Sequence, residues 1–401
     1  MGAGVSPPRI CIIRLSHFPG DPRLEREIAA LVDAGFIVDM LCSKRGQQRT
    51  RESLDGVVVR RMPVRHRRAS KLRYLLEYSF FFLLAFVLVS ALHLKHRYRL
   101  IQVNTLPDFL VFTALVPRLM GAKVLLDMHE VTPELYASKF QLPMDSPQVR
   151  LVALAEQLSA RFAHSVITVS EPTREVLTCR GTPAGKVHVV MNVADDRIFH
   201  PQRALPYGHR STEDPNFHLV CHGTIVERYG FQTAVRAVAI LRDRIPELRL
   251  SIVGEGDYLP VLRNLAEDLG VLDRVRFTGY VPYSEIVSYL SGCHVGLVTN
   301  LKDCFTDLVL PTKLMEYVAI GKPVISSRTR AIEKYFDQSM VLFFESGQAD
   351  DLASRIVELY ELREKRAQLV RNASQFIDRY HWKVIKEEYV SLVRQMANWS
   401  E

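Results

Sequence analysis

Short apolar runs alternate with longer segments of helical periodicity along nearly the whole chain. In the first half, the runs Ile10–Leu15, Val38–Cys42 and Val124–Met128 fit strands, and the segments between such runs fit amphipathic helices. The alternation of strand and helix patterns is typical of βα units joined into a mainly parallel sheet. The hydrophobic pattern therefore predicts an α/β fold.

The pattern divides the chain into two such series. It breaks between Asn192 and Asn216, where several prolines stand among polar residues, and a second series begins at Phe217. A length of 401 residues also fits two domains better than one. We therefore expect two doubly wound, Rossmann-like domains that face a central cleft, with residues 1–195 in the first, 196–216 as a linker, 217–375 in the second and 376–401 as a C-terminal helix.

Charge and cysteine content narrow the class of partner. The formal net charge is +8 and the pI about 9.1, which favours an anionic partner. No zinc-finger spacing or aromatic RNA-binding signature is visible, so nucleic acid is not predicted.

The six cysteines are scattered without a CxxC pair. This usage is typical of reduced thiols in a cytoplasmic protein and argues against a metal site built from cysteines.

One basic segment precedes a long apolar run. The run Tyr78–Leu92 covers about 15 residues, whereas a membrane-spanning helix needs about 20. Two interpretations stay open: a helix buried in the fold, or a helix lying on a membrane surface. In the second, anionic headgroups would contact the basic residues Arg65, Arg67, Arg68, Lys71 and Arg73.

The segment LPTKLMEYVAIGKPVI, residues 310–325, combines an apolar helical stripe with two charges, Lys313 and Glu316. Pro311-Thr312 suits a helix start, and Gly321 suits its end before a short buried strand. A helix N-terminus at the carboxyl edge of a sheet favours phosphate, and Glu316 one turn later could accept hydrogen bonds from a ribose. The alternative is an amphipathic helix whose two charges are solvated.

Several segments together resemble a known enzyme family. HFPGDPRLEREIAALVDAGF, SEP at Ser170, HGTIVERYGF, VGEGD at Val253, FTGYV at Phe277 and LPTKLMEYVAIGKPVI look like a retaining glycosyltransferase of family 4 with the GT-B fold, of the type that builds bacterial surface polysaccharides. The resemblance implies that the second domain binds a nucleotide-sugar and the first an acceptor. It also implies that the last helix crosses back to the first domain.

The resemblance assigns donor contacts residue by residue. Glu316 matches the second acid of the family's E-x7-E motif and would hold the ribose, whereas the first acid falls on Leu308. Thr312 and Lys313 would meet the diphosphate. The family's two bases fall on Thr224 and Tyr229, so Arg228 is the substitute candidate; further donor contacts are expected at Gly223, Gly254, Gly256, Tyr280 and Val281.

In the first domain the resemblance points to His129. It closes a predicted strand in LLDMHE and would face the donor sugar as the catalytic candidate. Gly20, Asp21 and Arg23 form a loop that would lie near the reacting centre, where Arg23 could meet phosphate. A solvated arginine in the first helical turn is the alternative for Arg23.

The function that follows is sugar transfer from a nucleotide-diphosphate sugar, UDP first and GDP next, to a lipid-linked saccharide acceptor in polysaccharide biosynthesis. We expect no cofactor or metal, since helix N-terminal amides and basic side chains can stabilise the leaving phosphate. The protein would be cytoplasmic and peripheral at the membrane. Two alternatives stay open: a nucleotide-sugar epimerase on the same fold, and a non-catalytic partner subunit.

Overall fold

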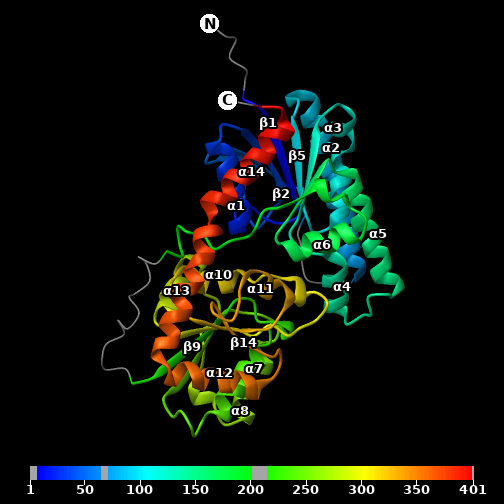
Figure 1. Ribbon diagram of the computed structural model, residues 1–401. Helices are drawn as coiled ribbons and strands as arrows, with labels where there is room; N and C mark the ends of the chain where they lie inside the picture. The colour runs from blue at the N-terminus through cyan, green and yellow to red at the C-terminus, as the bar shows by residue number, and fades with distance from the viewer. Residues whose placement is uncertain (1–6, 65–70, 201–214, 400–401) are drawn as a thin grey trace. The chain divides into compact units, whose positions relative to one another are not determined.

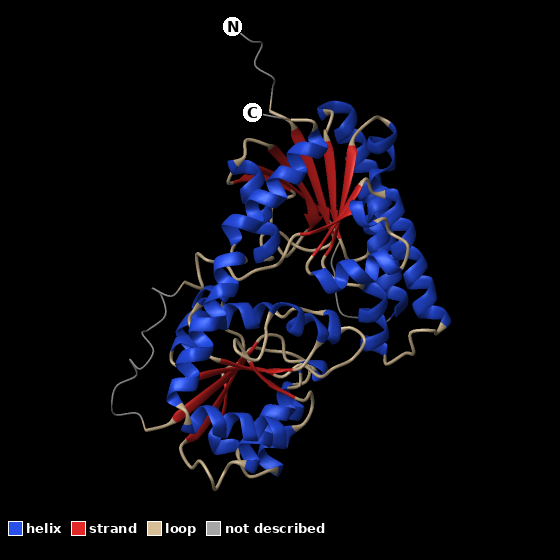
Figure 2. Ribbon diagram, in the orientation of Figure 1, coloured by secondary structure: helices blue, strands red, loops and turns tan. Residues whose placement is uncertain are grey.

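The computed structural model describes residues 7–64, 71–200 and 215–399, and the chain forms two compact units (Figure 1). The N-terminal unit contains Met1–Met191 and Lys383–Glu401, and the C-terminal unit contains Asn192–Trp382. Each unit has one sheet with helices on both of its faces (Figure 2).

The N-terminal unit is built on an eight-stranded sheet in the order β3-β4-β2-β1-β5-β6-β7-β8. All neighbours pair in parallel except β3, which is antiparallel to β4. The strands are β1 (Arg9–Arg14), β2 (Ile37–Ser43), β3 (Arg51–Leu54), β4 (Val57–Met62), β5 (Leu100–Asn104), β6 (Lys123–Met128), β7 (Ser165–Thr168) and β8 (Val187–Val189). The helices are α1 (Pro22–Asp33), α2 (Lys71–His96), η1 (Asp108–Ala114), α3 (Leu115–Leu119), α4 (Thr132–Phe140), α5 (Pro147–Phe162), α6 (Glu171–Cys179), η2 (Ala184–Lys186) and α14 (Trp382–Ala397).

The two faces of this sheet are covered by different helices. Ile101 and Val103 of β5 pack with Phe81 and Val89 of α2 in one apolar core. Because successive side chains of a strand point to opposite faces, Gln102 lies on the other face. That face carries α1 and α14, which lie alongside each other (Figure 1) and are joined by an ion pair from Lys386 Nζ to Asp33 Oδ2 at 2.7 Å.

The C-terminal unit has a six-stranded parallel sheet in the order β11-β10-β9-β12-β13-β14. Its strands are β9 (Phe217–His222), β10 (Leu248–Val253), β11 (Val275–Phe277), β12 (Val295–Val298), β13 (Val324–Ser327) and β14 (Leu342–Phe344). Its helices are η4 (Glu227–Tyr229), α7 (Phe231–Ile240), α8 (Leu259–Asp268), η5 (Leu272–Arg274), η6 (Tyr283–Glu285), α9 (Ile286–Ser291), η7 (Thr306–Leu308), α10 (Thr312–Ala319), α11 (Arg330–Tyr335), α12 (Ala349–Glu361) and α13 (Arg363–Arg379). The order is that of a Rossmann sheet, whose ligands bind where the strand order reverses, here at the carboxyl ends of β9 and β12.

Helix α2 is apolar on two opposite sides. Phe81, Ala85 and Val89 are fully buried against the sheet, whereas Leu83 and Val87 are 60% and 66% exposed. The stretch Leu76–His96, 21 residues with a mean hydropathy of 1.8, is long and apolar enough to cross a membrane, but it packs as a core helix along one side. The length expected from the sequence was therefore too short, because the helix continues beyond the run Tyr78–Leu92 at both ends.

Some predicted boundaries and elements need correction. The C-terminal unit begins at Asn192 rather than after residue 195, and α13 continues to Arg379, past the predicted end at residue 375. Strand β3 and helix α4 were not predicted, because each is short and lacks a continuous apolar run. The segment after β5 folds as the 3-10 helix η1 followed directly by the short helix α3.

Candidate functional site

In the N-terminal unit, polar side chains gather where β1, β5 and β6 end. The sheet register places Arg14 beside Asn104, and Asn104 beside Asp127. These are the last residues of β1 and β5 and the next-to-last residue of β6. The strand order reverses between β1 and β5, so this cluster occupies the position at which doubly wound sheets bind ligands.

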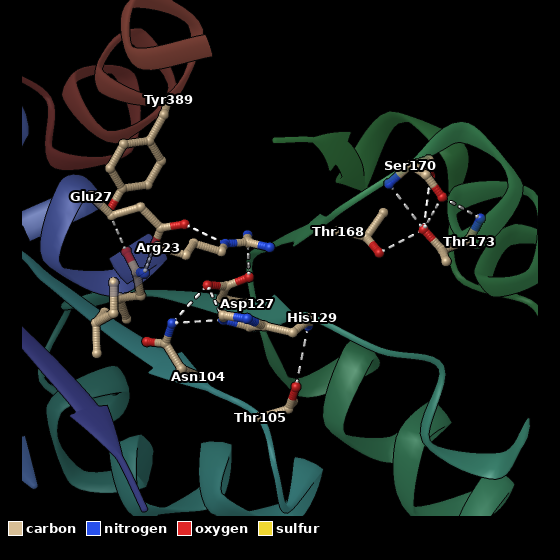
Figure 3. Close-up of polar contacts among 12 residues, drawn as sticks. Arg23, Glu27, Asn104, Thr105, Asp127, His129, Thr168, Ser170, Thr173 and Tyr389 are labelled. Carbon is tan, nitrogen blue, oxygen red and sulfur yellow. Dashed lines mark hydrogen bonds and ion pairs between the residues drawn. The ribbon is translucent and has the colours of Figure 1, made fainter. Parts of the chain in front are cut away.

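His129 follows β6 and contacts this cluster through one ring nitrogen. Its Nε2 lies 2.9 Å from Asp127 Oδ2 and 3.2 Å from Asn104 Nδ2. Arg14 NH1 is 3.3 Å from the same nitrogen. Asn104 Nδ2 also donates to Asp127 Oδ2 at 2.6 Å (Figure 3). All of these contacts are made by Nε2, and 17% of the His129 side chain is exposed to solvent.

Arg23 is a buried member of the same network. Its side chain is only 4% exposed; Nε donates to Glu27 Oε1 at 2.7 Å, and NH2 donates to Asp127 Oδ1 at 2.9 Å (Figure 3). The alternative of a solvated first-turn arginine is therefore wrong, because two buried carboxylates bind it. Arg23 NH1 has no hydrogen-bond partner among the described residues.

Burial dominates the electrostatics of this cluster. Burial raises the pKa of Asp127 to about 6, although the Arg23 guanidinium opposes that rise. Burial, with the positive charges of Arg23 and Arg14, lowers the pKa of His129 well below its usual range. At pH 7 the imidazole is therefore neutral and Asp127 is mainly ionised.

The loop before α1 is fixed by local contacts. Asp21 is the N-cap of α1, accepts hydrogen bonds from the amides of Arg23 and Leu24, and pairs with Arg14 at 2.6 Å. Gly20 has a φ of +149°, and a Cβ there would lie 2.7 Å from His17 Nε2. The structure thus brings Asp21 and Arg23 to the His129 cluster. Ser170 of the SEP segment caps α6 in the same way (Figure 3).

In the C-terminal unit, Glu316 of α10 is buried at the carboxyl edge of the sheet. Its Oε2 lies 2.6 Å from His222 Nε2, at the end of β9, and its Oε1 accepts from the Tyr283 hydroxyl at 2.9 Å. Tyr317 also contacts His222, with its hydroxyl 2.8 Å from Nδ1, and its ring packs on Gly296, where a Cβ would come within 2.6 Å. Each carboxylate oxygen of Glu316 has a second lone pair that could accept a hydrogen bond from a ligand hydroxyl.

Lys313 lies in the first turn of α10 without an anionic partner among the described residues. Its Nζ sits 5.0 Å from the centre of the Tyr229 ring and 5.2 Å from that of Phe231. Arg228 approaches the same Tyr229 ring at 5.5 Å, and its Nε is buried without a hydrogen bond in the part of the chain that the structure describes. Burial lowers the pKa of Lys313 to about 8. Two cations therefore share one aromatic ring beside the N-terminus of a helix.

The glycines of the C-terminal unit mainly allow close packing of its loops. A Cβ at Gly254 would lie 2.0 Å from the Gly223 carbonyl oxygen, and one at Gly256 would lie 2.0 Å from that of Ile225. These two glycines are thus required by the protein's own backbone. Gly223 itself has a φ of +120° and open space at its Cβ position.

The other predicted donor contacts differ in exposure. Tyr280 is 70% exposed, whereas Val281 is buried. Thr312 begins α10, where the first amides of a helix have no intrahelical acceptor. Leu308, at the position of the family's first acid, is buried in η7.

Sequence reasoning missed several residues of these clusters. Asp127 is the next-to-last residue of β6 and was taken as part of the apolar run Val124–Met128. His222 ends β9, but it was assigned to the loop segment HGTIVERYGF as its first residue. Tyr283 and Tyr389 gave no signal, because long-range packing alone brings them to these positions. Of the basic residues expected at a membrane, Arg65, Arg67 and Arg68 lie outside the described residues, and Lys71 and Arg73 lie in α2. No cluster of three or more His, Cys, Asp or Glu suited to a metal occurs in the described ranges.

Comparisons with known proteins agree with this geometry. Residues 21–192 match the family "Glycosyl transferase 4-like domain", and residues 208–376 match "Glycosyl transferases group 1". A GDP-mannose-dependent alpha-(1-6)-phosphatidylinositol monomannoside mannosyltransferase of Mycobacterium tuberculosis is 26% identical over 266 residues, 59% of this chain and 69% of that protein. The lipopolysaccharide core biosynthesis glycosyltransferase LpsE of Rhizobium meliloti is 28% identical over 43% of this chain and 48% of its own length.

Solved structures show the same architecture. Sucrose-phosphate synthase from Thermosynechococcus elongatus superposes with a TM-score of 0.75 at 20% identity, over 97% of this chain and 99% of that one. Anabaena HepE, solved in complex with UDP, gives 0.71 at 17% identity, over 96% and 100%. Two Rossmann-like units, each with a mainly parallel sheet covered by helices, therefore define a GT-B fold, as predicted. The chain is a glycosyltransferase: both of its units match glycosyltransferase family models, and its named relatives are glycosyltransferases.

Proposed function

We propose that the enzyme is a retaining, family 4-type transferase that takes a sugar from a nucleoside diphosphate donor bound by the C-terminal unit. The observation that carries this proposal is the buried Lys313 ammonium, which lacks an anionic partner among the described residues and lies in the first turn of α10. A buried cation without an ion pair is costly, and a diphosphate at the helix N-terminus would offset that cost. Arg228 would share the phosphate charge, and Glu316 would accept from the ribose.

The chemical step needs no protein nucleophile. The acceptor hydroxyl oxygen would attack the anomeric carbon on the face from which the diphosphate leaves. The carbon–oxygen bond to phosphate breaks, and the hydroxyl proton passes to a phosphate oxygen. In this proposal the helix amides, Lys313 and Arg228 stabilise the departing charge without a metal. His129 in the N-terminal unit would contact the donor sugar.

We propose that the nucleotide of the donor is a uridine diphosphate, with guanosine diphosphate as the second candidate. HepE was solved with UDP, whereas the mycobacterial relative is named as GDP-mannose-dependent. Calorimetry of the purified protein with UDP, GDP, ADP and TDP, in EDTA, separates these donors. Binding of one nucleotide that is lost in Glu316→Gln supports the proposal; undiminished binding in that variant contradicts the ribose role.

Transfer itself is tested by release of the nucleoside diphosphate from UDP-glucose, UDP-galactose and GDP-mannose in the presence of membrane extracts that contain lipid-linked saccharides. An α-linked product from an α-linked donor, read by NMR, is expected for retention. An inverted anomer would refute the assigned stereochemistry, and complete dependence on Mg²⁺ would refute the metal-free mechanism.

For the acceptor we propose a lipid-linked saccharide met at the cytoplasmic face of a membrane. The exposed side of α2, Leu76, Phe80, Leu83, Val87 and Leu94, supports this location. Basic residues flank both ends of the helix in the sequence, which suits anionic headgroups. Because the opposite side of α2 belongs to the core, the helix would lie in the membrane plane rather than span it.

A further inference from the structure

Both carboxylate oxygens of Glu316 are contacted by the protein itself, each by a different residue. Oε1 accepts from the Tyr283 hydroxyl at 2.9 Å, and Oε2 lies 2.6 Å from His222 Nε2. The Glu316 side chain is only 4% exposed. The last torsion of a glutamate is soft, so a carboxylate held at one oxygen still rotates, whereas one held at both oxygens keeps a single plane. Two partners therefore set the plane of the Glu316 carboxylate.

The His222 contact is fixed by the sheet of the C-terminal unit. His222 is the last residue of β9, and its Nδ1 lies 2.8 Å from the Tyr317 hydroxyl. That hydroxyl also donates to the Val220 carbonyl oxygen at 3.1 Å, and the Tyr317 ring packs on Gly296 of β12. Because both ring nitrogens of His222 have buried partners, the imidazole is a rigid support on this side of the carboxylate.

Tyr283 reaches the other carboxylate oxygen from the loop after β11. It is the first residue of η6 and half-buried, and its ring lies edge-on to that of Phe199 with 5.4 Å between the ring centres. Phe199 is 2% exposed and belongs to the same unit. Tyr280 and Val281, which are expected to frame the nucleotide base, precede Tyr283 in this loop. One short segment therefore carries the expected base contacts and one of the two supports of Glu316.

The lone pairs that remain on Glu316 suit a diol. A carboxylate oxygen has two lone pairs, so each oxygen keeps one after the contacts with Tyr283 and His222. A ribose has neighbouring hydroxyls at C2 and C3, and a carboxylate can accept one hydrogen bond from each when its plane matches that of the diol. Since the plane is fixed before the nucleotide binds, less ordering is needed on binding.

We propose that Tyr283 is a positioning residue that, together with His222, presents Glu316 to the 2′- and 3′-hydroxyls of the donor ribose and thereby sets the preference of the enzyme for ribonucleotides over deoxyribonucleotides. This rests on the proposed function, in which Glu316 accepts from the ribose. All of the residues concerned lie in the C-terminal unit.

Calorimetry with UDP and with 2′,3′-dideoxy-UDP measures that preference as a ratio of two dissociation constants. The wild-type enzyme should bind UDP at least about tenfold more tightly, because hydrogen bonds to a carboxylate are stronger than neutral ones. Tyr283→Phe removes the hydroxyl and keeps the ring beside Phe199. It should lower the ratio about three- to tenfold, with the affinity for dideoxy-UDP changed less than about twofold. GDP and its dideoxy form replace the uridine pair if GDP is the nucleotide that binds.

Tyr360→Phe is the matched control. The Tyr360 hydroxyl also donates to a glutamate, at Oε1 of Glu247. Glu247 directly precedes β10, at the amino ends of the strands, whereas Glu316 and its partners lie at the carboxyl ends. The control should therefore keep the wild-type ratio.

The outcomes separate this proposal from the function on which it rests. A Tyr283→Phe enzyme that keeps the wild-type ratio, or that loses affinity for both nucleotides equally, overturns the role of Tyr283 and leaves the ribose contact of Glu316 intact. Equal binding of UDP and dideoxy-UDP by the wild-type enzyme refutes the ribose contact itself, and the role of Tyr283 with it. Binding of neither uridine nor guanosine nucleotides refutes the proposed donor site as a whole.

Discussion

Replacing Lys313 with methionine should stabilise the free enzyme while weakening its binding of nucleotide. The side chain is buried, and burial lowers its pKa from 10.5 to about 8. That difference of about 2.5 pKa units corresponds to about 3 kcal/mol of destabilisation at pH 7, since each unit is about 1.4 kcal/mol. Loss of the contacts with the Tyr229 and Phe231 rings offsets about 1 kcal/mol. The expected net gain is about 2 kcal/mol.

The pH dependence follows from the same pKa difference. Between about pH 8 and pH 10.5 the unfolded chain binds a proton at Lys313 that the folded chain does not. The free energy of unfolding should therefore receive a contribution that rises with pH across this window, and Lys313→Met should lack it. Nucleotide affinity of the wild-type enzyme should fall above about pH 8 as the ammonium loses its charge.

Urea denaturation measures the stability, and calorimetry with UDP and GDP measures the binding. Loss of a charge-assisted contact to phosphate should weaken binding about 10- to 100-fold. Lys322→Met is the matched control, because Lys322 is also buried but donates to the Ser291 carbonyl oxygen at 2.6 Å. The control should be destabilised by about 1 kcal/mol with unchanged nucleotide binding. A Lys313→Met protein that is less stable than wild type and binds nucleotide normally would refute the reasoning.

Three further predictions concern other parts of the molecule. Glu316→Gln should reduce nucleotide affinity at least about tenfold, measured by calorimetry, because an amide replaces one acceptor oxygen and faces the His222 Nε2 donor or the Tyr283 hydroxyl; unchanged affinity would show that Glu316 is structural. Glu156→Gln should stabilise the protein at pH 8, because burial raises the pKa of Glu156 to about 8. In the wild-type protein the folded state therefore binds a proton that the unfolded state does not, and the free energy of unfolding falls between about pH 4.5 and pH 8, by up to about 1.4 kcal/mol for each pH unit. A thermal-melt series against pH that shows the same fall in the variant would contradict this assignment. Val87→Glu should lower binding to vesicles that contain anionic phosphatidylglycerol about tenfold or more. The control Val261→Glu changes an apolar residue of the C-terminal unit that is 47% exposed, and it should leave vesicle binding unchanged. Equal sedimentation of both variants with the vesicles would show that α2 does not contact the membrane.

The sequence by itself determined the architecture and the position of several site residues. Apolar runs separated by helical segments reflect the burial of parallel strands on both faces, and this local signal located β1, β2 and β6 to within one residue at either end. His129 and Glu316 could be located because each follows a recognisable strand or helix start. The basic flanks of α2 were equally legible, because charge depends only on composition.

Only the tertiary structure decided what those residues touch. Asp127 lies next to Asn104 because two strands pair in one register, and a one-residue slip would turn it to the opposite face. The hydrogen bonds that lead from Tyr389 through Gln102 to Asp127 join residues from α14, β5, α1 and β6, which no local pattern connects. Likewise, Lys313 and Arg228 approach one Tyr229 ring only because α10 and the loop after β9 meet at the strand ends. Local sequence fixes which groups reach an edge of the sheet, whereas the pairing of distant segments fixes their partners, and hence their protonation and charge.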